Sequence, residues 1–147
     1  MKNQFELRQS TAGDCDRLYR VQSQSMRPYV EQIWGWNESF QEERFRQGFE
    51  PDKTWVALSH EREIGFLRVT EKDEGIFIEQ IYIIPEYQGR GIGTALVREV
   101  LSKKLPVELS VLKLNTDARR LYERLGFRVN GESATHYHMR VEPDCRL

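Results

Sequence analysis

The run Ile76–Ile84 constrains the fold most, because it is nearly continuously apolar and rich in β-branched residues. Such a run predicts a central strand that is covered on both faces. Pro85 ends the strand, since proline lacks the amide hydrogen that a sheet ladder needs. A glycine-rich loop and an amphipathic helix follow, so this region predicts a crossover from one strand to the next.

Hydrophobic patterning on either side of this strand predicts the other elements. In chain order we expect a strand at 5–8, helices from Thr11 and after Asn37, strands at 54–59, 64–69 and 76–84, a helix after the glycine loop, a strand at 107–111, a helix at 116–125, and strands at 127–129 and 135–141. The order βααβββαβαββ mixes hairpins with one crossover and predicts an α/β fold with a mixed sheet. A length of 147 residues fits a single domain, residues 1–147.

Local features of the first half carry further expectations. Pro28 should interrupt or kink the first helix. Phe40, Phe45 and Phe49 should lie on roughly one side of the second helix. The charged turn His60–Glu63 should join the two strands that follow.

Composition and charge exclude several classes of protein. Apolar residues make up 39% and charged residues 31% of the chain, as in ordinary globular proteins. The formal net charge of −1 argues against a nucleic-acid partner, since general nucleic-acid binders usually carry a basic excess, but it leaves room for a local basic patch. No signal peptide or membrane-spanning run is present, so we expect no membrane partner. Cys15 and Cys145 belong to no metal or redox motif, which favours free thiols, no bound metal and a cytoplasmic protein.

The loop Gln88–Thr94 is suited to bind an anion. Its three glycines permit positive φ angles and let a ligand approach the backbone closely. Loop amides and the positive end of the following helix dipole attract a pyrophosphate, while Arg90 adds positive charge. The residues expected at the anion are Gln88, Gly89, Arg90, Gly91, Ile92, Gly93 and Thr94.

Other phosphate-binding loops share this chemistry but not this sequence. A Walker A loop ends in Gly-Lys-Ser/Thr, and a dinucleotide fingerprint requires Gly-x-Gly-x-x-Gly. Gly89, Gly91 and Gly93 fit neither pattern. Taken alone, the loop also allows a glycine-rich turn without a ligand.

Two segments together resemble the GNAT family of N-acetyltransferases. Gln88–Gly93 fits that family's pattern Gln/Arg-x-x-Gly-x-Gly/Ala, and Asn115–Phe127 resembles its second motif, Asn…Ala…Tyr…Gly-Phe. The strand and helix order fits from residue 5 to about residue 141. The resemblance implies a mostly antiparallel sheet with splayed middle strands, flanked by helices, and acetyl-CoA as the acetyl donor.

The resemblance also implies roles for individual residues. The strand backbone would hold the pantetheine arm of CoA in the gap between splayed strands, and the glycine loop would hold its pyrophosphate. Asn115 would reach the arm from the end of the next strand, and Tyr122 would point at the thioester sulfur. Beyond the loop, the implied cofactor-binding residues are Ile81, Tyr82, Ile83, Asn115, Ala118 and Tyr122.

Tyr122 also has a chemical argument of its own. Attack of an amine on acetyl-CoA expels a thiolate, and a phenol with a pKa near ~10 can protonate it. The alternative is a core aromatic, because Tyr122 is in helical register with Leu121 and Leu125.

The catalytic base has two sets of candidates. An amine must lose a proton before it can attack, and Glu79 on the central strand could accept that proton. A surface carboxylate is the alternative role for Glu79. His136 and His138 share one face of the last strand and could act instead, directly or through water.

The acceptor pocket of this family is usually built from the first helices and the last strands. Residues 26–37 are unusually rich in large aromatics, which suits a small amine with an apolar part. Arg27 could pair with a carboxylate and Glu31 with an ammonium. Alternatively, Trp34 and Trp36 cap the core at a helix corner. The substrate-binding candidates are Arg27, Tyr29, Glu31, Trp34, His136 and His138.

The sequence therefore predicts transfer of an acetyl group from acetyl-CoA to a primary amine of a small molecule, by direct attack in a ternary complex. A non-catalytic acetyl-CoA sensor and an acetyltransferase for protein or peptide amines are the alternatives. We expect a monomer or a homodimer.

Overall fold

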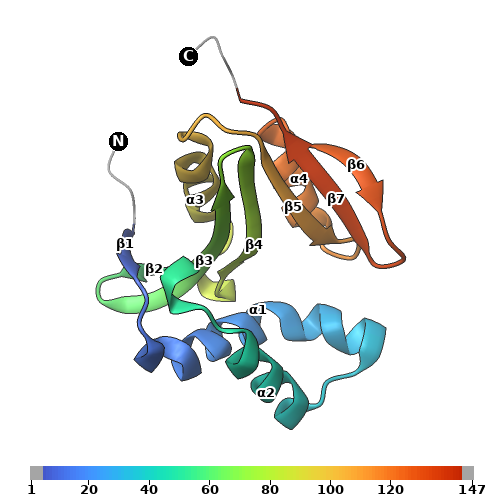
Figure 1. Ribbon diagram of the computed structural model, residues 1–147. Helices are drawn as coiled ribbons and strands as arrows, with labels where there is room; N and C mark the ends of the chain where they lie inside the picture. The colour runs from blue at the N-terminus through green and yellow to red at the C-terminus, as the bar shows by residue number, and fades with distance from the viewer. Residues whose placement is uncertain (1–4, 144–147) are drawn as a thin grey trace. The chain divides into compact units, whose positions relative to one another are not determined.

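The computed structural model describes residues 5–143 and confirms the predicted order of strands and helices (Figure 1). The strands are β1 (Glu6–Gln9), β2 (Thr54–Ser59), β3 (Arg62–Lys72), β4 (Gly75–Ile83), β5 (Val107–Leu112), β6 (Arg128–Glu132) and β7 (His136–Val141). The helices are α1 (Cys15–Trp34), α2 (Glu38–Gly48), α3 (Ile92–Leu101) and α4 (Thr116–Arg124), with short 3-10 turns at Ala12–Asp14, Pro51–Lys53 and Pro85–Tyr87.

The strands form one mixed sheet in the order β1-β2-β3-β4-β5-β7-β6. β4 and β5 run parallel and are connected through α3, whereas β1–β2, β2–β3, β5–β7 and β6–β7 are antiparallel. The predicted α/β fold with a mostly antiparallel sheet is thus confirmed. The chain divides into two compact units, Met1–Arg68 with Gln80–Gly93 and Val69–Glu79 with Thr94–Leu147, which are described in turn.

In the first unit, α1 begins near the predicted residue but does not stop where expected. Before it, the amide of Thr11 donates to Oδ2 of Asp14 (2.8 Å). Pro28 does not interrupt the helix, because α1 continues through it to Trp34, and the alternative of a kink at Pro28 stays a prediction. Proline removes a single helical hydrogen bond, and the bonds of the neighbouring turns hold the helix together.

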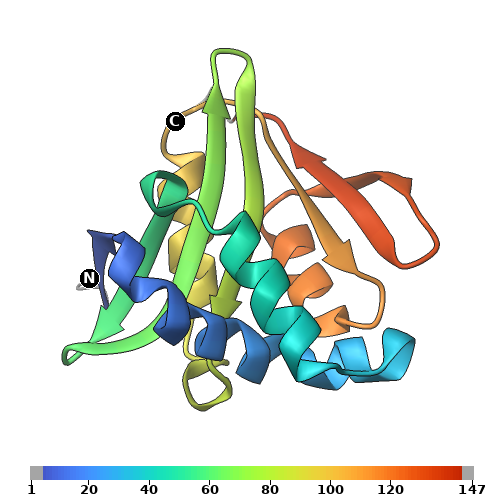
Figure 2. The ribbon, with the colours of Figure 1, turned by 60° about the horizontal axis from the view of Figure 1, so that its bottom comes forward.

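Helix α2 lies beside α1 and adds to an aromatic core (Figures 1 and 2). Oδ1 of Asn37 caps it by accepting from the amide of Phe40 (3.0 Å). Phe45 is buried and packs against Phe49 and Phe66, with ring centroids 5.8 and 6.0 Å apart. Phe40 is 57% exposed, so the expectation that it shares a packed side with Phe45 is wrong.

The turn between β2 and β3 is shorter than predicted. His60 and Glu61 have φ angles of 49° and 69°, and β3 begins at Arg62. A two-residue turn with both φ angles positive matches the twist of a hairpin.

Gly65 on β3 lies very close to β4. A Cβ at this position would stand 2.4 Å from the carbonyl oxygen of Tyr82 and 2.7 Å from Cδ1 of Ile83. The pairing of β2 with β3 shifts here, between Ala57 and Leu58. Because the nearest atom belongs to the backbone, a side chain at this position requires a strand to move.

Asp14 ties β1 to the start of α1. It is 2% exposed and accepts two hydrogen bonds from Arg8 (2.8 and 2.9 Å) and one from Arg17 (2.7 Å). The hydrogen bond from Arg8 holds the pKa of Asp14 well below its usual range, against the opposing effect of desolvation.

In the second unit, one face of the sheet is covered by helices and the other is open. The covered face is lined by three residues that are aligned across β4, β5 and β7, namely Ile78, Leu109 and Met139. All three are almost fully buried. Phe77 lies on the opposite face and is 41% exposed. The prediction that β4 is covered on both faces is therefore wrong for this stretch.

Helix α4 ends one residue earlier than predicted, at Arg124. Gly126 has a φ of 98°, as expected for a residue that ends a helix in the left-handed region. Its amide donates to the carbonyl of Glu123 (3.0 Å).

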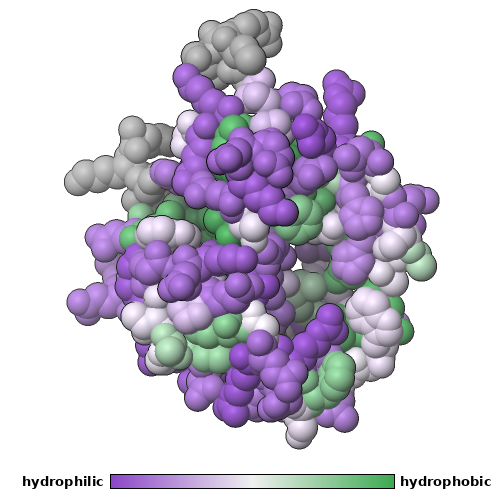
Figure 3. All heavy atoms as spheres, viewed as in Figure 1, coloured by the Kyte–Doolittle hydropathy of each residue, from purple (hydrophilic) through white to green (hydrophobic). Residues whose placement is uncertain are grey.

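The part of the molecule seen in Figure 3 is mostly hydrophilic. Among residues 5–143, no helix has the length and apolar character to cross a membrane. Cys15 is a free thiol, and Cys145 lies outside the described residues.

Replacing Gly65 should destabilise the fold. We expect Gly65→Ala to lower the free energy of unfolding by about 1–3 kcal/mol, because β3 and β4 must separate to admit the methyl group. Gly48→Ala is the matched control, since a Cβ at the end of α2 would meet nothing within 4 Å. Urea unfolding followed by circular dichroism measures the stability of both variants. Equal unfolding midpoints for the two variants would contradict the close approach of β3 and β4 at Gly65.

The low pKa of Asp14 should make the fold acid-sensitive. In the unfolded chain this carboxyl protonates near pH ~3.9, so its ion pairs stabilise the fold fully above that pH. Their contribution is lost as the pH falls from there through the lower folded-state pKa. Asp14→Asn should lower the free energy of unfolding at pH 7 by about 2 kcal/mol, given that Arg8 is partly solvated.

The same variant should lose less stability than the wild type between neutral and strongly acidic pH. Urea titrations across that range compare the two slopes. Parallel pH curves for the variant and the wild type would refute the role of Asp14.

Candidate functional site

The loop between β4 and α3 has the backbone form that an anion site requires. Gly89 and Gly91 have φ angles of 77° and 83°, in the left-handed region that favours glycine. A Cβ at either position would meet nothing within 4 Å. Both glycines are exposed, so a ligand can reach the loop backbone.

The side chain of Gln88 fastens this loop to the end of β4. Its Nε2 donates to the carbonyl oxygen of Ile83 (2.8 Å), which also accepts from Oγ of Ser25 (2.9 Å). The Ser25 hydroxyl has one proton and also lies 3.0 Å from the carbonyl oxygen of Val21, so the bond from Gln88 is the one that commits the Ile83 carbonyl. The Ile83 carbonyl, predicted to belong to a pantetheine-binding strand, is therefore already engaged.

Arg90 is exposed and stacks on a ring that the sequence analysis did not single out. Its guanidinium lies 4.6 Å from the centroid of Tyr87, and that of Arg62 lies 5.8 Å from the same ring. Glu86 pairs with Arg62 (2.8 Å). Tyr87 thus holds Arg90 beside the loop by a cation–π contact.

The last loop residues lead into α3. Ile92 is 2% exposed, so its side chain belongs to the core and only its backbone is available to a ligand. Gly93 and Thr94 are half-buried in the first turn of the helix. The positive end of the helix dipole lies at this turn.

Ile81 and Tyr82, the other predicted strand residues, are half-buried near the end of β4. The ring of Tyr82 packs edge-on against Phe66, with centroids 5.3 Å apart. Desolvation raises the pKa of its phenol. This side chain is a packing element of the first unit.

Helix α4, in the second unit, carries the second predicted motif. Asn115 is its N-cap, and Oδ1 accepts from the amide of Ala118 (3.2 Å). Tyr122 is 7% exposed, and its ring centroid lies 5.8 Å from that of Phe127. Tyr122 therefore has the packing of a core aromatic, and only a small part of it faces solvent.

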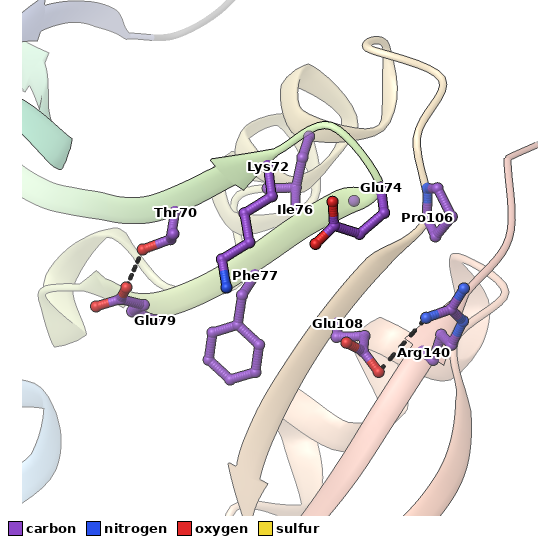
Figure 4. A pocket seen from close by; sticks show the side chains of 10 residues that line it. Thr70, Lys72, Glu74, Ile76, Phe77, Glu79, Pro106, Glu108 and Arg140 are labelled. Atoms are coloured by element: carbon purple, nitrogen blue, oxygen red, sulfur yellow. Dashed lines mark hydrogen bonds and ion pairs between the residues drawn. The ribbon is translucent and has the colours of Figure 1, made fainter.

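Glu79 projects from the open face of the second unit. Its Oε1 accepts a short hydrogen bond from Oγ1 of Thr70 on the neighbouring strand (Figure 4). The hydroxyl orients this carboxylate, which lines a groove on the same face.

The two candidate histidines are bound to hydroxyl groups. Ser110 and His138 are aligned on β5 and β7, and Oγ of Ser110 lies 2.6 Å from Nδ1 of His138. Nδ1 of His136 lies 2.8 Å from Oγ1 of Thr135. Burial, and then the charge of His138, lower the pKa of His136 below its ordinary value, so it is neutral at pH 7.

The groove beside Glu79 has a volume of about 380 Å³ (Figure 4). Its side chains include Lys72, Glu74, Phe77, Glu79, Glu108 and Arg140. The sequence analysis missed this site, because it depends on the alignment of separate strands. The available signal was the alternation of charged and apolar residues along β5 and β7.

Two of the predicted acceptor residues of α1, Arg27 and Glu31, pair with each other. Arg27 and Glu31 form a short ion pair one helical turn apart, and Arg27 also lies 5.5 Å from the ring centroid of Trp36. Trp34 is 60% exposed, so the alternative role of capping the core does not describe it. Tyr29 is half-buried, and its helical position lies away from the Arg27–Glu31 side.

Within residues 5–143, no group of three or more His, Cys, Asp or Glu side chains is placed to hold a metal ion.

Known proteins match most of this chain. Residues 16–127 match the model of the Acetyltransferase (GNAT) family. The chain is 25% identical over 157 residues to YafP, an uncharacterized N-acetyltransferase of Escherichia coli K12. This alignment covers 96% of the chain and 98% of YafP.

Two further relatives have named acceptors. The peptidyl-lysine N-acetyltransferase YjaB of Salmonella typhimurium is 34% identical over 80 residues, 54% of this chain and 52% of that protein. The thialysine N-epsilon-acetyltransferase of Mus musculus is 33% identical over 85 residues, 54% of this chain and 50% of that protein. The matches span about half the length of these two relatives.

Solved structures share the fold. The PaiA N-acetyltransferase of Thermoplasma acidophilum, in complex with coenzyme A, has a TM-score of 0.77 at 20% identity, with 97% of this chain and 99% of that chain covered. The ribosomal-protein-S18-alanine N-acetyltransferase of Escherichia coli has a TM-score of 0.71 at 16% identity, with 95% of this chain and 94% of that chain covered.

The loop geometry predicts that Arg90 contributes to anion binding. Arg90→Ala should weaken the binding of coenzyme A by about three- to tenfold and reduce its salt dependence, because an exposed charge near a pyrophosphate is lost. Arg98→Ala removes the same charge from an exposed position on α3 and serves as the control. Calorimetric titration at two salt concentrations measures both, and equal affinities for the two variants would show that Arg90 has no such role.

Proposed function

Because this chain belongs to the acetyltransferase (GNAT) family, we propose that it transfers the acetyl group of acetyl-CoA to a primary amine of a small molecule. The loop after β4 is the observation that carries this proposal, since its two left-handed glycines open the backbone to a pyrophosphate. The amine would attack the thioester directly while both substrates are bound.

The proposed contacts to CoA follow from the backbone and side chains described above. The amides of Gly89–Gly93, with Arg90 and Thr94, would bind the pyrophosphate. The backbone of Ile81–Ile83, apart from the engaged Ile83 carbonyl, would bind the pantetheine arm. Asn115 and Ala118, in the second unit, are also proposed to contact CoA.

Tyr122 is proposed as the acid. Acetyl-CoA supplies an activated acyl group on a thiol leaving group. A phenol of ordinary pKa is protonated at pH 7 and can give its proton to the departing thiolate. This role requires the hydroxyl to belong to the 7% of Tyr122 that is exposed.

Glu79 is proposed as the base that receives the proton of the attacking amine. An ammonium ion has no lone pair, so the proton must leave before attack. The hydrogen bond from Thr70 supports this role, because it fixes the carboxylate on the open face. His138, oriented by Ser110, and His136 are the second choice.

The acceptor is proposed to be an amine at the end of a flexible chain. One relative is named for peptidyl-lysine and another for thialysine, and both names describe side-chain amines. Trp34 would offer aromatic surface to the apolar part of a small acceptor, beside the Arg27–Glu31 pair, whereas Tyr29 lies away from that pair. The peptidyl-lysine relative favours a lysine in a peptide as the second candidate.

Removing the hydroxyl of Tyr122 tests the reaction. Tyr122→Phe should lower kcat by about 10- to 100-fold, because the thiolate would leave unprotonated, while the affinity for acetyl-CoA should change less than about twofold. Thiol release with a panel of primary amines gives kcat, and calorimetry gives the affinity. Tyr137→Phe is the control, since its ring contacts Lys113 and Arg119 and its hydroxyl has no proposed role.

Unchanged kcat in Tyr122→Phe would remove the acid role. Acetyl-CoA binding without turnover on any amine would support the sensor instead, and turnover with peptides alone would favour the second candidate.

A further inference from the structure

The groove on the open face offers one positive and one negative group that have no counter-ion among residues 5–143. Arg140 lies 3.6 Å from Glu108 and 2.7 Å from Glu142, and Glu79 accepts from Thr70. Within residues 5–143, Lys72 and Glu74 form no ion pair. A ligand that carries a carboxylate and an ammonium group would supply a counter-ion to Lys72 and to Glu74.

Lys72 and Glu74 flank the tip of the β3–β4 hairpin. Lys72 is the last residue of β3, and Glu74 precedes the first residue of β4. Figure 4 shows both side chains projecting over β4 on the side of Phe77, with Glu79 farther along the same strand.

The spacing along β4 matches the length of a basic amino acid. Phe77 and Glu79 are two residues apart, which is about 7 Å in a strand. In lysine, five bonds of about 1.5 Å in a zigzag place the side-chain nitrogen about 6 Å from Cα. If the side-chain amine of a bound lysine lies at Glu79, the Cα atom of that lysine lies over Phe77. Its α-carboxylate and α-ammonium groups are then within reach of Lys72 and Glu74.

Phe77 completes the groove. It is 41% exposed, and most of the other side chains that line the groove are charged. Methylene groups of an alkyl chain that lie on this ring are removed from water, which favours binding.

We infer that the acceptor is a free basic amino acid that binds in this groove rather than at the α1 surface around Trp34, with its α-carboxylate at Lys72, its α-ammonium at Glu74 and its side-chain amine at Glu79. This inference rests on the proposed acetyl transfer. The amine nitrogen forms a bond to the acetyl carbon as the carbon–sulfur bond breaks. The proton of the amine passes to Glu79, and the expelled thiolate takes a proton from Tyr122 and leaves as the thiol of CoA. A polyamine would place a second cation against Lys72, and a lysine within a peptide lacks both α-charges.

Three acceptors of equal chain length test the inference: L-lysine, its Nα-acetyl N-methylamide, and 1,5-diaminopentane. The wild type should acetylate L-lysine with a KM about tenfold or more below that of the other two, because only L-lysine carries both α-charges. Mass spectrometry should place the acetyl group on the side-chain nitrogen.

Two variants test the assigned contacts. Lys72→Gln and Glu74→Gln should each raise the KM for L-lysine by about tenfold, with little change for the blocked derivative. Lys103→Gln is the control for lysine, because Lys103 pairs with Glu71 and does not line the groove. Asp73→Asn is the control for glutamate, since this exposed turn residue does not line the groove either.

The outcomes separate the inference from the proposed function. If no amine releases thiol from acetyl-CoA, the proposed function fails and the inference with it. If the blocked derivative or 1,5-diaminopentane is acetylated as well as L-lysine, or if Lys72→Gln affects all three equally, the inference fails while acetyl transfer stands.

Discussion

The parallel pairing of β4 with β5 is the constraint on which the functional part of the fold depends. Ile76–Ile78 pair with Val107–Leu109, and parallel neighbours require a crossover rather than a tight turn. Helix α3 is that crossover, so a strand-to-helix junction must follow β4. Gly89 and Gly91 adopt left-handed conformations at this junction. The topology therefore places a helix N-terminus after these two glycines, and such a terminus is suited to bind an anion.

The same pairing decides what the open face presents. Phe77, Glu108 and Arg140 are aligned across three strands, and their neighbours in the chain point into the core beneath the helices. Because side chains alternate along a strand, polar groups can gather on one face without entering the core. The candidate base Glu79 and the groove share this face, so catalysis and acceptor recognition can rest on the same strands.

Local signals in the sequence predicted the elements, whereas long-range arrangements escaped prediction. The cap at Asn37 involves neighbouring residues, and the helix begins after Asn37 as expected. The apolar run of β4 did not reveal that Phe77 is exposed, because the burial of a strand face depends on whether segments distant in sequence pack against it. The groove escaped prediction for the same reason. The Arg27–Glu31 pair could have been foreseen, since residues four apart on a helix are neighbours.

Direct transfer within a ternary complex is most directly tested by the pattern of initial rates. When acetyl-CoA and a primary amine are varied together, direct attack predicts double-reciprocal lines that intersect, because both substrates must be bound before the thiol is released. Parallel lines would indicate an acetylated enzyme intermediate. Such an intermediate, formed for instance on Ser110 beside His138, would contradict direct transfer.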